Sequence, residues 1–198
     1  MNRTAIRTLT VSAAVIGAAA ALVAGAASAS ADATGGTSTI TVPVATEVAQ
    51  AQAGIVEIPL SPAQTSYNSV TQSVDETFTV TGGDARISVF VGHLEHSGGL
   101  LIVDYKTKKS VQLTNIVFDL INDQISAVPS GGTDPVVFFD ARGSHVSQRT
   151  GTTDSFSASD LQVDAAGAAY LNGALGTSYF VAGQSAGSYA ASWDNADG

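Results

Sequence analysis

The chain has 198 residues, of which 17 are acidic, 8 are basic and none is cysteine, so its formal net charge is −9. This balance argues against a nucleic-acid partner, because polyanion binding depends on clustered Lys and Arg. The one basic cluster, Lys106 to Lys109, is interpreted as a solvated hairpin tip. Without cysteine, the chain has neither a disulfide framework nor a site for a lipid-modified N-terminus.

The first 31 residues have the pattern of a secretory signal peptide. Arg3 and Arg7 precede an uncharged run of small and apolar residues at 11–27, and an A-x-A cleavage pattern occurs at 27–29 and at 29–31. The run is too short and too rich in Ala and Gly for a bilayer span. We therefore expect a secreted, extracellular protein, free or attached to the cell wall, with no membrane anchor after cleavage.

Cleavage at residue 31 would leave 167 residues, which is enough for one domain. This part of the chain contains all 17 acidic residues and six of the basic ones. Residues 32–73 are low in complexity and are predicted to form an N-terminal segment with edge strands. Pro59 and Pro62 argue against a central strand there. Residues 74–198 are predicted to form a β-sandwich domain.

The segment from residue 78 alternates between apolar and polar side chains. This period of two predicts strands at 78–80 and 87–91, joined by a turn at Gly82-Gly83. A change of parity within 111–120 predicts a β-bulge near Thr114-Asn115. Asn122-Asp123 predicts a hairpin turn.

Later segments complete the prediction of the fold. Residues 136–139 are predicted to be a buried strand, 141–154 an exposed loop, and the segments around 178–183 and 188–193 strands. A helix is predicted after Asp164, ending at Gly176. The fold class is therefore all-β: an antiparallel β-sandwich or barrel-like domain with one short helix near the C-terminus, preceded by a signal peptide.

The sequence 183–187 matches the G-x-S-x-G pattern of hydrolases, with Ser185 in the position of the nucleophile. The nucleophile elbow requires a helix after the serine, and an acid and a histidine later in the chain. A strand-like segment follows Ser185, and the last histidine, His145, lies upstream. We therefore predict no catalytic residues and no enzyme.

His93, Glu95 and His96 lie close together in the sequence, and imidazole and carboxylate suit transition metals. On a strand, His93 and Glu95 share one face while His96 faces the other. The sequence therefore predicts no metal site here. His145 is interpreted as a surface residue in a polar loop.

Several short motifs together resemble secreted actinobacterial heme-transport-associated domains. They are FTVTGG at 78–83, FVGHLEHSGGLLI at 90–102, VQLTNIVFDL at 111–120, VVFFDA at 136–141, and the stretch from Leu161 to Gly187. The resemblance covers about 110 residues. It implies an extracellular protein that binds heme through an axial Tyr supported by a His.

Carried over to this chain, the resemblance implies that His96 is the supporting histidine and that Tyr179 lies near the pocket. The family's axial tyrosine follows Trp-Gly and Ser-Phe elements that are missing here, and Tyr67 is the N-terminal tyrosine that could replace it. We therefore expect no resident cofactor and weak or no heme binding. The favoured hypothesis is a non-catalytic β-domain with an unknown partner, such as a small ligand or a cell-envelope component. The first alternative is a domain that binds heme or another ligand, and the second is a hydrolase.

Overall fold

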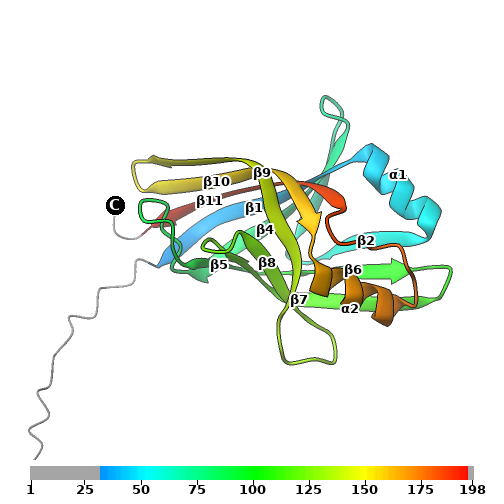
Figure 1. Ribbon diagram of the computed structural model, residues 1–198. Helices are drawn as coiled ribbons and strands as arrows, with labels where there is room; N and C mark the ends of the chain where they lie inside the picture. Colours follow the sequence, from blue (N-terminus) through cyan, green and yellow to red (C-terminus); the bar gives the residue numbers. More distant parts are fainter. Residues whose placement is uncertain (1–31, 196–198) are drawn as a thin grey trace, which may run out of the picture.

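The computed structural model describes residues 32–195, so the predicted signal peptide at 1–31 lies outside the described residues. Eleven strands form one antiparallel sheet (Figure 1). They are β1 (Ala33–Pro43), β2 (Ile55–Leu60), β3 (Gln64–Asn68), β4 (Ser73–Gly83), β5 (His93–His96), β6 (Gly99–Asp104), β7 (Lys109–Asp119), β8 (Gln124–Pro129), β9 (Val136–Thr150), β10 (Thr153–Val163) and β11 (Ser185–Asn195). No helix within 32–195 is long and apolar enough to cross a membrane.

Eight of these strands close into a barrel. Their order is β7-β5-β4-β1-β11-β10-β9-β8, and β8 pairs with β7 to complete the ring. β6 and β2 extend the sheet from β7, and β3 pairs only with β4. The prediction of an all-β, antiparallel, barrel-like domain is therefore confirmed.

The interior of the barrel is rich in aromatic side chains. Phe118, Phe138, Phe156 and Trp193 are fully buried. They come from β7, β9, β10 and β11. Along β10, buried positions alternate with less buried ones, as expected for a strand with one face toward the core. Eight strands give an interior that side chains can fill.

Two helices flank the sheet (Figure 1). The predicted C-terminal helix is confirmed as α2 (Ala165–Leu175), with Asp164 accepting a hydrogen bond from the backbone N–H of Ala166 and Gly176 in the left-handed conformation. A second helix, α1 (Val44–Ala53), was not predicted. Its Ala, Glu and Gln residues favour a helix without forming a clear apolar stripe.

The structure also confirms details of β7 and β8. The register of the β7–β8 pairing changes between Thr114 and Val117. Asn115 lies at this change and has a φ of 50°, which marks the predicted bulge. Asp123 has φ of 54° at the turn into β8. Positive φ at an Asn or Asp is tolerated at such turns.

Several predictions for individual segments are wrong. Residues 87–90 form a turn closed by the bridge between Arg86 and Val91, not a strand. Residues 141–154 lie mostly in the β9–β10 hairpin, not in a loop. Residues 177–184, including the expected strand around Tyr179, are irregular.

The N-terminal segment belongs to the same sheet as the later strands. β1 lies between β4 and β11, so the expectation of an edge strand is wrong for it. β2 and β3 do lie at edges of the sheet, as expected, and Pro59 is in β2. An edge position accommodates proline because its missing N–H is not needed by a neighbour.

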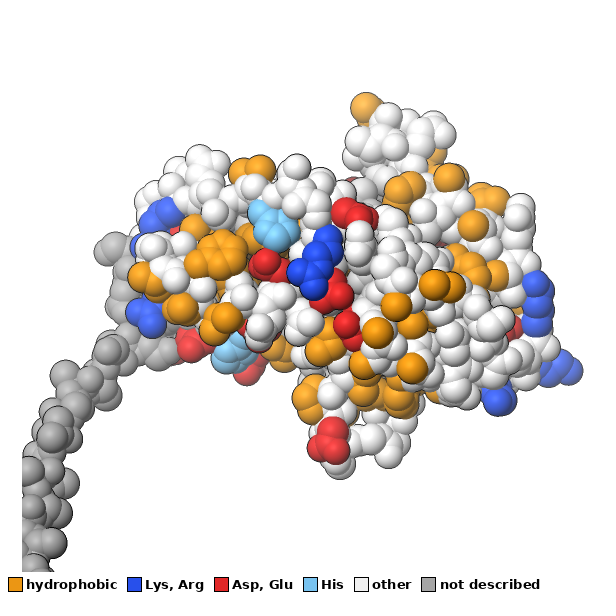
Figure 2. Space-filling view, in the orientation of Figure 1, with side chains coloured by type: hydrophobic (Ala, Val, Ile, Leu, Met, Phe, Trp, Pro, Cys, Tyr) orange, Lys and Arg blue, Asp and Glu red, His pale blue; other side chains and the backbone are white. Residues whose placement is uncertain are grey.

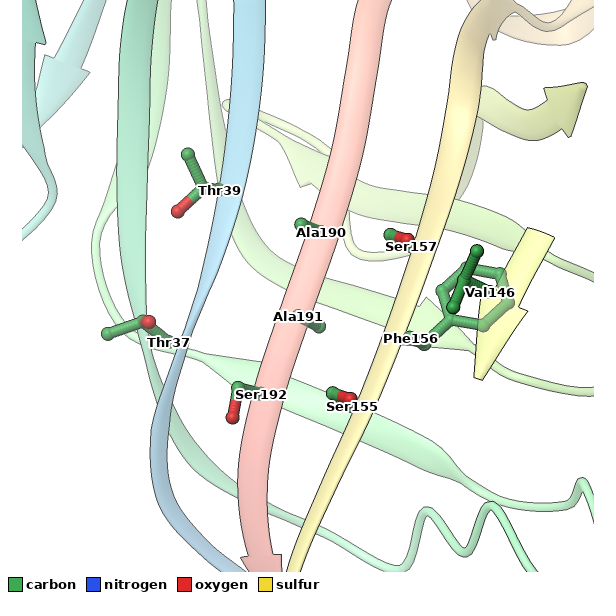
Figure 3. A pocket seen from close by; sticks show the side chains of 9 residues that line it. All are labelled: Thr37, Thr39, Val146, Ser155, Phe156, Ser157, Ala190, Ala191 and Ser192. Atoms are coloured by element: carbon green, nitrogen blue, oxygen red, sulfur yellow. The ribbon is translucent and has the colours of Figure 1, made fainter. Parts of the chain in front are cut away.

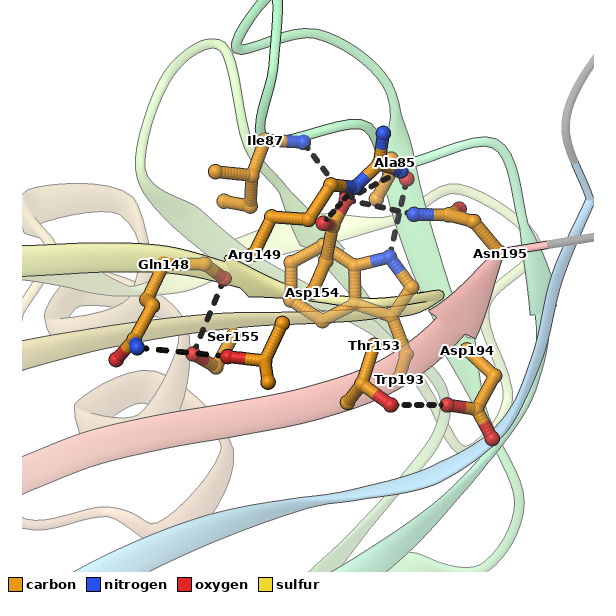
Figure 4. Close-up of polar contacts among 11 residues, drawn as sticks. Ala85, Ile87, Gln148, Arg149, Thr153, Asp154, Ser155, Trp193, Asp194 and Asn195 are labelled. Carbon is orange, nitrogen blue, oxygen red and sulfur yellow. Dashed lines mark hydrogen bonds and ion pairs between the residues drawn. The ribbon is translucent and has the colours of Figure 1, made fainter. Parts of the chain in front are cut away.

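A buried carboxylate fixes one end of the barrel (Figure 4). Asp154 in β10 accepts hydrogen bonds from Arg149 Nε at 2.7 Å, from the backbone N–H of Ile87 at 3.1 Å and from Asn195 Nδ2 at 2.6 Å. Trp193 Nε1 donates to the carbonyl oxygen of Ala85 at 3.0 Å. These contacts hold the 84–92 loop against β10 and β11.

Candidate functional site

His96, the histidine singled out by the resemblance, lies in the barrel interior within a chain of hydrogen bonds. Its Nδ1 is 3.1 Å from the carbonyl oxygen of Ile116, and its Nε2 is 2.6 Å from Ser38 Oγ. Ser38 Oγ is in turn 2.9 Å from Tyr189 Oη. Ser38 and Tyr189 come from the neighbouring strands β1 and β11 and were not predicted as site residues.

The direction of each hydrogen bond follows from its partners. A carbonyl oxygen only accepts, so His96 Nδ1 carries a hydrogen and Nε2 of the neutral ring accepts from Ser38. Burial lowers the pKa of His96 to about 4, against a smaller opposing effect of its hydrogen bond to Ile116. Burial also raises the pKa of Tyr189, so its hydroxyl remains protonated and donates to Ser38. These three hydrogen-bonded side chains are therefore neutral, and each of their polar groups has a partner.

The space beside the hydrogen-bonded side chains of His96, Ser38 and Tyr189 is small. One cavity, lined by residues that include Ser38, His96 and Tyr189, has a volume of about 10 Å³, and a neighbouring one that includes Ile40 and Phe78 has about 20 Å³. A single water molecule needs a cavity of about this volume. The interior therefore does not admit a ligand of macrocycle size.

The structure does not bring the other two predicted site residues to His96. Tyr67 is exposed on β3, where it pairs with Val74 of β4. Tyr179 lies in the irregular segment after α2 and lines a cavity of about 10 Å³ together with Gln50 and Glu57. The three residues therefore lie in three different environments.

Ser185 lies at the start of β11, so a strand follows it, as the sequence predicted, rather than a helix. Its Oγ donates to Asp160 Oδ1 at 2.6 Å. A serine nucleophile needs a neighbouring base such as imidazole. This environment does not match the hydrolase elbow.

The predicted division of the His93 region between two faces is confirmed. His93 Nε2 lies 3.5 Å from Glu95 Oε1 on the outer face of β5, while His96 is buried on the inner face. Within residues 32–195, no group of three His, Asp or Glu side chains is arranged to hold a metal ion.

An open groove of about 670 Å³ lies on this outer face, over β5, β7 and β8. Its apolar wall consists of Val91, Val117, Ile121 and Pro135, and its polar groups include His93, Asp84, Glu95 and Asp119. Ile121 is 62% exposed. The groove is within the size range of small-molecule and cofactor sites.

Two glycines shape the wall of the groove beside His93. Gly83 has φ of 114°, and a Cβ on it would lie 2.1 Å from the carbonyl oxygen of His93. Gly92 has φ of 91°, and a Cβ there would lie 2.3 Å from the carbonyl oxygen of Asp84. The backbone N–H groups of Asp84 and Ala85 both donate to the His93 carbonyl oxygen. These positions require glycine, because only glycine tolerates both the conformation and the close approach.

A second depression, of about 300 Å³, lies on the outer face of β1, β11 and β10 (Figure 3). Its lining residues are mostly small: Thr37, Thr39, Ser155, Ser157, Ala190, Ala191 and Ser192, with Phe156 and Val146 at one side. It has hydroxyl groups but no charged side chain and no imidazole. It is therefore less suited than the groove to fix a specific ligand.

Acidic side chains gather at the α1 end of the barrel. Burial raises the pKa of Glu57 to about 7 and of Glu76 to about 8, and the charge of Glu47 adds to both effects. Gln50 donates to Glu57 Oε1 at 3.0 Å, while Gln50 Oε1 and Glu76 Oε2 have no hydrogen-bond partner. Carboxyl groups in such surroundings favour the protonated form.

Basic side chains are few on the surface shown in Figure 2 and stand apart from one another, except at one end of the molecule. The cluster formed by Lys106, Lys108 and Lys109 is exposed around the turn between β6 and β7, as expected for a solvated hairpin tip. These residues are not among those that line the groove.

Comparison with known proteins finds a likeness of fold. No family model matches the chain, and no curated protein matches its sequence. Among solved structures, the C-terminal domain of HtaA from Corynebacterium glutamicum superposes with a TM-score of 0.61 at 12% identity, over 84% of this chain and 99% of that one. The heme-binding protein HtaB from the same organism gives a TM-score of 0.46 at 9% identity, over 83% of this chain and 94% of that one.

The chain therefore has the fold of the HtaA C-terminal domain, which confirms the resemblance seen in the sequence at the level of fold. Heme is the cofactor that the resemblance implies. The interior around His96 does not fit it, because the cavity is too small and both imidazole nitrogens are hydrogen-bonded. The outer groove fits it, since it combines sufficient volume, an apolar wall and the imidazole of His93.

Proposed function

We propose that this protein is a non-catalytic domain that captures heme outside the cell, and that the macrocycle lies in the outer groove. The observation that carries the proposal is the groove itself, about 670 Å³ in volume and walled by Val91, Val117, Ile121 and Pro135. Apolar walls suit the faces of a macrocycle, and an open mouth leaves its propionates in water. The motifs that resemble heme-transport-associated domains support the same choice of ligand, and the fold shared with the HtaA domain agrees with that resemblance.

The carboxylates of the groove affect how an anionic ligand binds. Asp84 is paired with His93, and Asp119 accepts hydrogen bonds from the backbone N–H groups of Ile121 and Asn122, but Glu95 is largely exposed. Heme propionates at the mouth of the groove would be repelled by this charge. The repulsion acts through solvent and is screened by salt.

We therefore expect the affinity for heme to rise as the ionic strength is increased from about 10 mM to 150 mM, because the Debye length falls over this range from about 30 Å to 8 Å. Absorbance titration of the purified protein with ferric heme at the two salt concentrations would measure this. An affinity that falls with salt would contradict the placement in an acidic groove.

A substitution in the apolar wall tests the site directly. We expect Ile121→Asp to weaken binding of both ferric heme and metal-free protoporphyrin about tenfold, because it removes an apolar contact worth about 1.5 kcal/mol or more and adds a charge beside the ring. Ile121 lies in the exposed turn between β7 and β8, so the fold should tolerate the change. Absorbance and fluorescence titrations give the two affinities.

Val70→Asp is the matched control, since Val70 is also an exposed aliphatic residue and lies outside the groove. It should leave both affinities unchanged. If the unsubstituted protein binds neither porphyrin, heme capture is wrong and the alternative of an unknown partner is favoured. Equal binding by the Ile121 variant and the control would place the ligand elsewhere.

A further inference from the structure

We infer that His93 is the protein ligand of heme iron in the groove and that Asp84 holds its ring in position. The inference rests on the proposed function and adds the residue that binds the metal. Neither residue was predicted as a cofactor ligand from the sequence. The inference depends on how the two nitrogens of His93 are placed.

Asp84 determines which nitrogen of His93 is free. The Nδ1 atom lies 2.8 Å from Asp84 Oδ1, and the backbone N–H of His93 donates to the same oxygen at 3.0 Å. A carboxylate oxygen accepts, so Nδ1 carries the hydrogen and, in the neutral ring, Nε2 has the lone pair. Nε2 is the nitrogen left to bind a metal.

The free nitrogen belongs to a ring that is partly exposed at the groove. The His93 side chain is 42% exposed and lines the groove. Nε2 lies 3.5 Å from Glu95 Oε1, and both atoms are acceptors in this tautomer. Two acceptors at this distance repel each other, and a cationic metal centre bound at Nε2 relieves that repulsion.

A carboxylate on the far nitrogen is typical of metal-binding histidines. It fixes the tautomer and ring orientation and makes the ligating nitrogen more basic. Asp84 is held in place for this role by the backbone: its N–H donates to the His93 carbonyl oxygen at 3.0 Å, and Gly83 and Gly92 permit the close approach. Asp84 is therefore a positioning residue and His93 the ligand.

The other two histidines are less suitable. His96 uses both nitrogens in hydrogen bonds and is buried. His145 Nε2 lies 3.2 Å from the carbonyl oxygen of Ala141 and must donate to it, while its Nδ1 faces Asp123 at 3.6 Å. Of the three histidines, His93 has a side chain that lines the groove and a carboxylate partner on Nδ1.

Comparing two porphyrins separates iron ligation from ring binding. We expect His93→Ala to weaken ferric heme binding at least tenfold and to change its Soret spectrum. It should weaken binding of metal-free protoporphyrin by a smaller factor, because the His93 side chain also lines the groove. Added imidazole should restore the spectrum of the His93→Ala complex. Asp84→Asn should weaken ferric heme binding about tenfold or more, because Asp84 positions the His93 ligand. Its effect on the metal-free ring should be smaller than its effect on ferric heme, since only heme has the iron that His93 binds.

His145→Ala is the control and should change neither affinity nor spectrum. His93→Gln serves as a second variant if His93→Ala does not fold, which circular dichroism would show. An unchanged heme spectrum in the folded His93 variants would overturn the assignment of His93 while leaving heme capture intact. Failure of the unsubstituted protein to bind either porphyrin would instead contradict the proposed function.

Discussion

Replacing Asp154 by alanine is expected to destabilise the fold by about 3–5 kcal/mol, because it leaves a buried network without its central acceptor. Asp154 is 0% exposed, and its carboxylate accepts hydrogen bonds from Arg149, Asn195 and the backbone of Ile87. In the variant, the buried Asn195 amide and the Ile87 N–H lose this acceptor. Urea denaturation monitored by Trp193 fluorescence would measure the loss, which corresponds to roughly 10 °C in Tm for a domain of this size.

Asp194→Ala is the matched control on the neighbouring strand. The Asp194 side chain is exposed and accepts one hydrogen bond, from Thr153 at 2.7 Å. A surface contact of this kind contributes at most about 1 kcal/mol. Equal destabilisation by the two alanine variants would show that the buried network does not stabilise the fold in the way described.

The same network connects the stability of the fold to the groove. Asp154 binds the backbone of Ile87 and Trp193 binds that of Ala85, so both hold the loop that supplies Asp84 and Val91 to the groove wall. Loosening this loop would alter the position of Asp84 relative to His93. A folded Asp154 variant that binds heme less tightly would therefore be consistent with the proposed site.

Where local sequence determines local structure, the fold could be predicted. Asp164 and Gly176 mark the ends of α2, because an N-cap carboxylate and a left-handed glycine satisfy the terminal backbone groups of a helix. The bulge at Asn115 follows from a change of parity within one strand. In both cases, the information lies within a few neighbouring residues.

Other segments depend on contacts that the pattern does not show. Residues 142–150 of β9 are exposed and, apart from Val146, not apolar. They therefore have no apolar alternation, and only pairing with β10 makes them a strand. Conversely, Ile87, Val89 and Val91 alternate but belong to a turn, in which Phe90 has φ of 53°. The alternation of apolar and polar residues therefore predicted the wrong secondary structure in both segments.

The candidate site was only partly predictable for the same reason. The alternation rule correctly separated His93 and Glu95 from His96. It could not show that Asp84, nine residues earlier, contacts His93, because that contact depends on the conformations of Gly83 and Gly92. The resemblance drew attention to His96, whose neighbours Ser38 and Tyr189 come from distant parts of the chain.

The acidic cluster at the α1 end makes the stability of the fold depend on pH. The pKa of Glu76 is raised by burial, and further by the charges of Glu57 and Glu47, to about 8. Its carboxyl is 2% exposed and one oxygen has no hydrogen-bond partner. The folded state therefore retains a proton that the unfolded chain releases near pH 4.5, and stability falls as the pH rises between these two values.

His96 has the opposite effect, in a different range of pH. Its pKa is lowered from 6.5 to about 4 by burial, so its contribution is fully present above pH 6.5 and is lost as the pH falls toward 4. Between pH 6.5 and 8, His96 is neutral in the folded state. In the unfolded state it is half protonated at pH 6.5 and loses the remaining proton as the pH rises, which adds less than about 0.5 kcal/mol of stability over the interval. The effect of the glutamates can therefore be measured in this interval.

We expect the free energy of unfolding to fall by about 2 kcal/mol between pH 6.5 and 8, since each proton retained by the folded state contributes about 1.4 kcal/mol per pH unit. Glu76→Gln should remove most of this dependence and make the protein more stable than the original at pH 8, because the amide cannot ionise. Urea denaturation at several pH values would measure both effects. Glu95→Gln, at an exposed position, is the control and should keep the original slope. A flat profile in the unsubstituted protein would contradict the protonation of Glu76 in the fold.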